Sequence, residues 1–459
     1  MKNSRESAIL YAHENRARFL EELQDWVRFP SVSTDPEHKQ DMQRAAEWMA
    51  AHLQSIGVQK TTIYPTPQHP IVFGEYHCSQ DNAPTILIYG HYDVQPAEPL
   101  ELWQSDPFAP VVRGENLYGR GASDMKGQVM ASVNAVEAAL SQGELPVHIK
   151  FLIEGEEEIG SPNLSAFLKE HQDLLKATAA LNPDSGMIAA EAPTITYGLR
   201  GLAYFELRVY GPEHDLHSGL FGGVVNNPAQ VLCELIASMH DEKGRITLPG
   251  FYDRVTPLEA EERHQLARLP VSADFYKEQT GVPELWGEEG FTPVERVGAR
   301  PTLEVNGLLS GYTGAGSKTV LPSWAMAKIS MRLVPKQDPA EVQEQLIAHL
   351  KQHAPKTVRW ELEPLAHSPA SISDRNHPAT QALARALQTV WGVAPVYRRE
   401  GGSISVVADM QSILGLESVL TGFGLPDDQI HAPNEKLHLP TWHRGIDALI
   451  HFLYNVGSH

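Results

Sequence analysis

Two short runs of consecutive apolar residues, separated by a stretch of helical periodicity, restrict the fold of this chain more than any other feature. Thr85–Tyr89 and His148–Ile153 have the length and apolar character of strands buried on both faces of a sheet. Between them, Val129–Leu140 has apolar residues at helical spacing and follows Gly127. This order of strand, helix and strand predicts a mostly parallel sheet covered by helices.

The periodicity changes twice along the 459 residues, a length that exceeds what one hydrophobic core normally supports. Helices and strands alternate over residues 1–197, and the same rhythm returns over residues 372–459. Between these parts, Ala203–Tyr210 alternates as a strand with one exposed face does, and Pro339–His353 is an amphipathic helix. We therefore expect an α/β domain that is interrupted by an inserted α+β domain at residues 198–371.

Composition excludes several classes of function. The net charge of −20 disfavours nucleic acid, whose phosphates need Lys and Arg, and otherwise serves solubility. With only two cysteines, Cys78 and Cys233, neither a disulfide framework nor a thiolate metal site is expected. No run approaches the ~20 apolar residues of a membrane span, and the first residues lack the apolar core of a signal peptide. We expect a cytoplasmic enzyme without a membrane partner.

Polar residues follow both buried strands directly. His91 and Asp93 come after the first strand, and Glu156, Glu157 and Glu158 come after the second. Functional groups gather at the carboxyl ends of parallel strands, although three consecutive acids are more often a solvated charge run. Adjacent residues point in different directions, so one acid can bind a metal while its neighbour faces the metal's water. We assign Glu158 as the ligand and Glu157 as the general base.

Three further groups complete a candidate metal centre. Asp124 lies among closely spaced glycines, which favour a tight turn that aims its carboxylate; a helix N-cap is the equal alternative. Downstream lie Asp184 and His431. Two imidazoles and several carboxylates can hold two divalent metals and leave one carboxylate to handle a proton, as in hydrolases that activate water. Oxygen and nitrogen ligands suit zinc, manganese and cobalt.

The inserted domain and the last part of the chain supply weaker candidates. Arg332 lies in a predicted strand, where it either clamps a substrate carboxylate or pairs with a surface acid. His217 precedes a glycine-rich stretch that is typical of a loop. Ser403, in Glu400–Ser403, offers a hydroxyl and backbone amides to an anion.

Taken together, these motifs resemble the co-catalytic di-zinc peptidase family of carnosinases, cytosolic nonspecific dipeptidases, aminoacylases, succinyl-diaminopimelate desuccinylases and glutamate carboxypeptidases. The resemblance covers nearly the whole chain and is nearest to the carnosinase and nonspecific-dipeptidase branch. The segments that carry it are Gly90–Ala97, Asp215–Gly223, Lys318–Pro322, Arg399–Ser403 and Ile430–Leu437. Two segments depart from that branch: Met125 stands where it often has a second acid, and Leu365–Ala370 matches only loosely.

The resemblance implies a role for each metal ligand. Asp124 matches the carboxylate that bridges two metals, with His91 and Asp184 on one metal and Glu158 and His431 on the other. The peptide bond after the bridging aspartate is expected to be cis. Zinc is the favoured metal, with two ions in each subunit.

The resemblance also implies the remaining roles. Glu157 matches the general base and Asp93 the acid that orients His91. Arg332 and Ser403, with Thr319 nearby, match positions that hold the substrate's C-terminal carboxylate.

In the family, the inserted domain acts as a lid and forms a homodimer, and the histidine that matches His217 reaches the partner's active site. We expect a dipeptidase acting on short peptides with a free carboxylate. An N-acyl-amino-acid amidohydrolase is the alternative, and a non-catalytic binding homologue is a remote third.

Overall fold

The computed structural model describes residues 2–143 and 145–458, which form two compact units. The first comprises residues 2–197, 373–398 and 405–458, and the second comprises residues 198–372 and 399–404. Residues 399–404 thus pack with the second unit, whereas the sequence analysis assigned them to the α/β domain. Among the described residues, no helix has the length and apolar character needed to cross a membrane.

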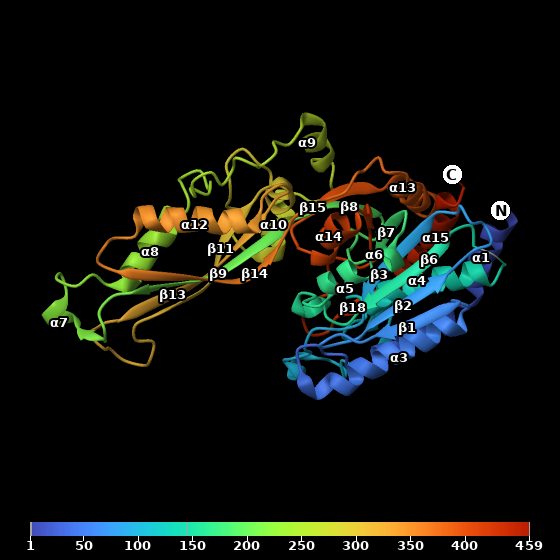
Figure 1. Ribbon diagram of the computed structural model, residues 1–459, viewed down its shortest axis with the longest axis horizontal. Helices are drawn as coiled ribbons and strands as arrows, with labels where there is room; N and C mark the ends of the chain where they lie inside the picture. The colour runs from blue at the N-terminus through green and yellow to red at the C-terminus, as the bar shows by residue number, and fades with distance from the viewer. Residues whose placement is uncertain (1, 144, 459) are drawn as a thin grey trace. The chain divides into compact units, whose positions relative to one another are not determined.

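The first unit is an α/β layer structure (Figure 1). Its main sheet has the strand order β1-β2-β6-β3-β7-β17-β8, and the short strand β16 (Val396–Glu400) also pairs with β8. Strand β15 (Ser371–Ile372), whose residues belong to the second unit, continues this sheet by pairing with Leu199 and Gly198 at the end of β8. The strands of that order are β1 (Lys60–Tyr64), β2 (Ile71–Tyr76), β6 (His148–Glu154), β3 (Thr85–His91), β7 (Ala179–Asn182), β17 (Ser418–Leu420) and β8 (Thr194–Leu199). A small second sheet contains β18 (Lys436–His438), β5 (Asn116–Tyr118) and β4 (Val111–Arg113).

The centre of the main sheet is parallel, as expected, and its margins are antiparallel. Strand β3 pairs in parallel with β6 and β7, and β17 pairs in parallel with β7. Strand β2 runs antiparallel to both β1 and β6, and β17 runs antiparallel to β8. Antiparallel neighbours can be joined by short connections, so β1 and β2 need no crossover helix.

Helices cover this sheet because their apolar faces have no other place to be buried. Six of them share one hydrophobic core with the strands. These are α1 (Lys2–Glu14), α2 (Arg16–Val27), α3 (Lys39–Ser55), α4 (Lys126–Leu140), α13 (Pro378–Trp391) and α15 (Leu439–Val456). Helix α4 is buried on nearly every side, which is typical of a central helix. The shorter helices are α5 (Leu164–Glu170), α6 (Gln172–Leu175) and α14 (Ser405–Asp409).

The second unit is an antiparallel sheet with two helices along one face (Figure 1). Its strand order is β11-β13-β9-β14, formed by Thr302–Ser310, Trp324–Leu333, Gly201–Tyr210 and Arg359–Ser368. Alternate residues of β13 are buried, so the sheet has one covered and one open face. The covering helices are α8 (Pro228–Ser238) and α12 (Pro339–His353).

Short elements complete this unit. A two-stranded ribbon pairs β10 (Leu216–His217) with β12 (Val320–Leu321) and is followed by α7 (Ser218–Phe221). The remaining helices are α9 (Ala260–Leu266), α10 (Ala273–Thr280) and α11 (Pro293–Ala299).

Candidate metal centre

The carboxyl ends of three parallel strands bring the candidate ligands to one edge of the sheet. His91 is the last residue of β3 and is level with Glu154, the last residue of β6. Asp184 follows the end of β7 by two residues. Because β6, β3 and β7 are neighbours in the sheet, residues just beyond their ends meet at the same edge.

A first group of ligands contains His91, Asp124 and Asp184, whose donor atoms lie within 4.8 Å of one another. Nε2 of His91 lies 3.3 Å from Oδ1 of Asp124 and 4.0 Å from Oδ1 of Asp184. This Nε2 is buried and has no partner in hydrogen-bond geometry. The imidazole nitrogen thus points at two carboxylates without being satisfied by either.

A second group shares Asp124 with the first and adds Glu158 and His431, again within 4.8 Å. Nε2 of His431 lies 2.9 Å from Oδ2 of Asp124 and 3.4 Å from Oε2 of Glu158. The two oxygens of Asp124 therefore face different histidines. This disposition of one carboxylate between two ligand groups is the one that a bridging ligand requires. The side chain of His431 is 50% exposed, whereas that of His91 is fully buried.

Asp93 contacts His91, two residues before it, and the backbone of Glu157 and Glu158. Its carboxylate accepts hydrogen bonds from the backbone N–H groups of Glu157 (3.2 Å) and Glu158 (3.0 Å). Nδ1 of His91 lies 3.0 Å from the backbone carbonyl of Asp93 and 3.4 Å from its Oδ1. The sequence analysis expected the carboxylate alone to hold the ring; the carbonyl makes the shorter contact.

Asp124 lies in a tight turn that directs its side chain toward the two histidines. The Asp124–Met125 peptide bond is cis, as the resemblance implied. Helix α4 starts at Lys126 with Met125 at the N-cap position and without a side-chain cap, so the alternative that Asp124 is a helix cap is wrong. A Cβ atom on Gly127 would lie 2.2 Å from the carbonyl oxygen of Ala122, so this position of the turn requires glycine.

The crowding of carboxylates perturbs the acid–base properties of the centre. Hydrogen bonds to Asp124 and Glu158 raise the pKa of His431 to about 10. Burial raises the pKa of Glu157 well above its usual range, and the neighbouring carboxylates of Asp184 and Glu158 add to the effect. Burial alone would lower the pKa of His91, yet its contacts with Asp124 and Asp93 raise it. The donor set and the unsatisfied Nε2 of His91 fit divalent cations.

Comparisons with known proteins identify the family. The profile of peptidase family M20/M25/M40 matches residues 87–455. The chain belongs to this family. The Cys-Gly metallodipeptidase DUG1 of Candida albicans is 32% identical, over 97% of this chain and 96% of that protein. The human Beta-Ala-His dipeptidase is also 32% identical, over 94% of this chain and 89% of that protein. The crystal structure of the M20 family metallo-carboxypeptidase Sso-CP2 from Sulfolobus solfataricus superimposes with a TM-score of 0.87, at 32% identity, and the match covers 96% and 99% of the two chains.

In this M20 peptidase, the candidate residues of the second unit form two separate pairs. Nη1 of Arg332 donates to Oγ of Ser403 (2.8 Å), and Arg332 lines a cavity of about 420 Å³. His217 is paired with Val320 in the β10-β12 ribbon, and the carbonyl of Thr319 accepts from the backbone N–H of Ser218. Thr319 therefore lies beside His217, whereas the sequence analysis grouped it with Arg332.

The length of β13 separates these pairs. Arg332 is near its end, level with Leu202, whereas Trp324 at its start is level with Tyr210. The ribbon that carries His217 and Thr319 connects to β9 and β13 beyond the Trp324 end. Eight residues of extended strand span roughly 26 Å. One short substrate therefore cannot touch both pairs of the same chain.

The sequence analysis missed several groups that hold the ligands of this M20 centre. Nε2 of Gln95 donates to Oε2 of Glu158 (2.8 Å). Glu435 accepts from the backbone N–H of Asp124 (3.0 Å). Gln95 and Glu435 both lie inside segments that carry the family resemblance, and this was the only available signal, because neither ends a strand.

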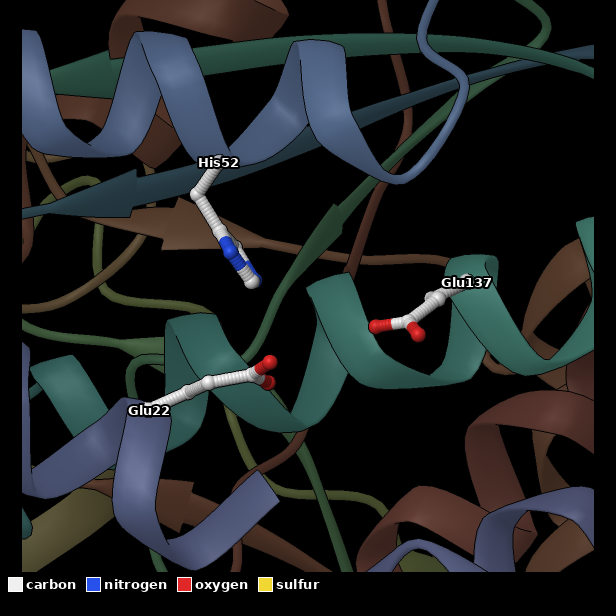
Figure 2. A group of neighbouring side chains, drawn as sticks. All are labelled: Glu22, His52 and Glu137. Carbon is white, nitrogen blue, oxygen red and sulfur yellow. The ribbon is translucent and has the colours of Figure 1, made fainter. Parts of the chain in front are cut away.

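A third group of ligand-like side chains lies in the helical layer of the same unit. Figure 2 shows Glu22, His52 and Glu137 pointing toward one another from α2, α3 and α4. Here Arg18 donates to Oε1 of Glu22 (2.5 Å) and Oε1 of Glu137 (2.5 Å), and the hydroxyl of Tyr11 also donates to Glu137 (2.9 Å). The guanidinium of Arg18 pairs with both carboxylates, so we interpret this group as an ion-pair cluster.

Proposed function

We propose that the chain is a metal-dependent dipeptidase that hydrolyses the amide bond of dipeptides or similar short substrates with a free C-terminal carboxylate. The observation that carries the proposal is Asp124, whose two oxygens face His91 and His431 in two adjoining ligand groups. The membership in the M20/M25/M40 family and the metallodipeptidase names of the relatives point to the same chemistry.

In this proposal, two divalent cations share Asp124. His91 and Asp184 complete one set of ligands, and Glu158 and His431 complete the other. Zinc is the first choice, since histidine and carboxylate ligands suit it, and manganese and cobalt are the alternatives. Such a pair of metals lowers the pKa of a water molecule and polarises the scissile carbonyl.

Glu157 transfers the proton of the attacking water to the leaving amine. Its carboxylate lies beside both ligand groups and belongs to neither, so it can accept a proton from the attacking water. The environment that raises its pKa also stabilises its protonated form, from which it delivers the proton to the leaving amine. Asp93 holds the backbone of Glu157 and thereby fixes the position of this base.

Arg332 binds the substrate's C-terminal carboxylate in this proposal, with Ser403 at its side. The guanidinium is half-buried, and among the described residues it donates to the hydroxyl of Ser403 through Nη1 alone, so its other donors are available to a carboxylate. A requirement for a free carboxylate favours short peptides over internal peptide bonds. The nearby cavity offers room for the C-terminal side chain.

The remaining pair, His217 and Thr319, acts on the partner subunit of a homodimer. The length of β13 places them too far from Arg332 to serve the same substrate. Beside them, Leu220 is 74% exposed and Val224 is 84% exposed, an apolar surface that a second copy would cover. From there, the imidazole of His217 stabilises the developing oxyanion of the partner's substrate.

A substrate screen tests the proposed reaction. Ala-Ala and N-acetyl-alanine differ in whether the substrate has a free amine, so each is offered alone with zinc, manganese or cobalt. We expect rapid hydrolysis of Ala-Ala. A strong preference for N-acetyl-alanine would assign the chain to the amidohydrolase alternative, and turnover of neither substrate class with any metal would contradict the proposal.

A complementation experiment tests the dimer. His217→Ala and Glu157→Gln are each expected to be inactive, and their subunits are dissociated and reassociated together. A mixed dimer has one site with both defects and one site with neither, so its activity returns to about half that of the unmodified dimer if His217 acts across the interface. The absence of recovery despite demonstrated subunit exchange would place His217 in its own chain's site or in a structural role.

A further inference from the structure

One buried ion pair connects three of the five segments that carry the candidate ligands, those of His91, Asp124 and His431. Nη1 of Arg120 donates to Oε2 of Glu435 (2.8 Å), and the two side chains are only 1% and 0% exposed. Glu435 lies four residues after His431, and Arg120 lies four residues before Asp124. Neither residue belongs to a ligand group.

Both oxygens of Glu435 hold the backbone around Asp124. Oε1 accepts from the N–H groups of Ser123 (2.9 Å) and Asp124 (3.0 Å). Oε2 accepts from the N–H of Gly121 (2.9 Å), in addition to Arg120. Hydrogen bonds from N–H groups to a carboxylate are stronger than those between neutral groups, and a buried site strengthens them further. One carboxylate therefore fixes the turn from which the Asp124 side chain projects.

Arg120 extends the same clamp to the other two loops. Its Nη2 donates to the carbonyl of Pro96 (3.2 Å), in the loop that follows His91 and Asp93. The same nitrogen donates to the carbonyl of Ala432 (3.3 Å), which is adjacent to His431. One guanidinium thus holds the backbone adjacent to His431 and the loop that begins after His91.

We infer that Glu435 is a positioning residue which, together with Arg120, sets Asp124 between the two ligand groups and makes the two cation sites form as one unit. The inference rests on the proposed function, since it assigns a role toward the cations of that site. Groups that hold metal ligands in place tune the affinity for the metal, and their loss typically weakens it by about 10- to 100-fold.

The second unit contains a comparably buried ion pair without contacts to a ligand segment. Arg300 donates to Glu288 through Nε (2.7 Å) and Nη2 (2.8 Å), and the side chains are 7% and 5% exposed. Nη1 of Arg245 makes a longer contact of 3.4 Å with Oε1 of Glu288. The chemistry and burial of the Arg300–Glu288 pair resemble those of the Arg120–Glu435 pair. Glu288→Gln therefore controls for the general cost of breaking a buried ion pair.

The first experiment measures metal affinity by competition with a chelator. We expect Glu435→Gln to weaken the binding of both cations by about 10- to 100-fold. Glu288→Gln should bind both cations as the unmodified chain does, although each variant loses thermal stability. Unchanged affinity in Glu435→Gln, or an equal loss in Glu288→Gln, would overturn the inference. A failure of the unmodified chain to bind two cations would instead overturn the proposed function.

A second experiment separates positioning from charge balance and needs no metal. Arg120→Gln combined with Glu435→Gln removes both charges, so thermal stability should recover relative to Glu435→Gln while metal affinity stays low. In the metal-free protein, hydrogen exchange over residues 121–124 should accelerate in Glu435→Gln and stay slow in Glu288→Gln. Should Glu435→Gln fail to fold, Glu435→Asp keeps the charge but shortens the reach, and the same exchange pattern is expected. Unchanged exchange over this segment would contradict the clamp.

Discussion

Two regions of the first unit gather two carboxylates around an imidazole, and they differ in what neutralises them. Asp124, Glu158 and His431 meet at the carboxyl edge of the sheet, whereas Glu22, His52 and Glu137 meet between three helices. In the helical group, Arg18 forms ion pairs with both glutamates. In the described part of the chain, Asp124 and Glu158 at the sheet edge form ion-pair contacts with histidines rather than with Lys or Arg, and the proposed metals would supply the missing positive charge.

The difference shows why ligand-like residue types alone do not identify a metal site. Burial lowers the pKa of His52, and Arg18 lowers it further against the pull of Glu137. In contrast, hydrogen bonds to Asp124 and Glu158 raise the pKa of His431 to about 10. Burial therefore dominates the environment of His52, whereas the neighbouring carboxylates dominate that of His431.

The largest expected effect comes from removing the shared carboxylate. Asp124→Ala should abolish most metal binding and lower the hydrolysis rate by about 1,000-fold or more, because both cations lose a ligand. Its counterpart in the helical group, Glu137→Ala, should keep its metals and rate and lose roughly 2 kcal/mol of folding free energy. Elemental analysis, rate assays and denaturant unfolding check both variants. If Asp124→Ala retained two cations, the group at the sheet edge would not differ from the helical group in its role in metal binding.

A smaller effect separates metal binding from proton transfer. Glu157→Gln keeps the volume of the side chain but removes the base, so the rate should fall by about 100-fold. The metal content should remain at two per chain, since Glu157 belongs to neither ligand group. Near-normal turnover in this variant, together with an inactive Glu158→Gln, would mean that the roles of the two neighbours are exchanged.

The smallest effect concerns the guanidinium of the helical group. Arg18 is 38% exposed, so Arg18→Gln should cost only about 1 kcal/mol of stability at neutral pH. In the folded protein, the pKa of His52 lies below its ordinary value of 6.5. The folded state therefore gains stability from the neutral imidazole above pH 6.5, and it loses this contribution as the pH falls below 6.5.

Removing Arg18 brings the pKa of His52 closer to its ordinary value. The variant should therefore lose less stability than the unmodified chain between pH 6.5 and 5, as measured by denaturant unfolding. An identical pH dependence in both proteins would show that Arg18 does not control the charge of this group.

Much of the fold follows from local sequence signals. Helix α12 has its predicted bounds because it begins with proline at its first position. Strands β3 and β6 were visible as continuous apolar runs. Strand β1 was not predicted, since Lys60–Tyr64 is neither strongly apolar nor alternating. Its strand state depends on pairing with β2.

The residues of the candidate centre also divide into those that the sequence predicted and those that it did not. His91, Asp124, Glu158, Asp184 and His431 stood out because they follow strands or lie in distinctive motifs, and the structure brings all five together. Hydrogen bonds between a side chain and the backbone of a distant segment leave no recognisable motif in the sequence. The backbone N–H of Ser123 donates to the carboxylate of Glu435, which is 312 residues away in the sequence. Local periodicity cannot predict a contact between residues so far apart. The separation of Thr319 from Arg332 likewise depends on the register of β13.

The unequal exposure of the two histidines has a kinetic consequence. His431 is half open to solvent and has φ = 60° in its loop, whereas His91 is sealed beneath the sheet edge. A chelator reaches the first through water and the second only after the surrounding loops open. The proposed pair of cations should therefore leave in order, the His431 ion on a faster timescale than the His91 ion. Partly depleted enzyme would then be a defined one-metal species rather than a mixture.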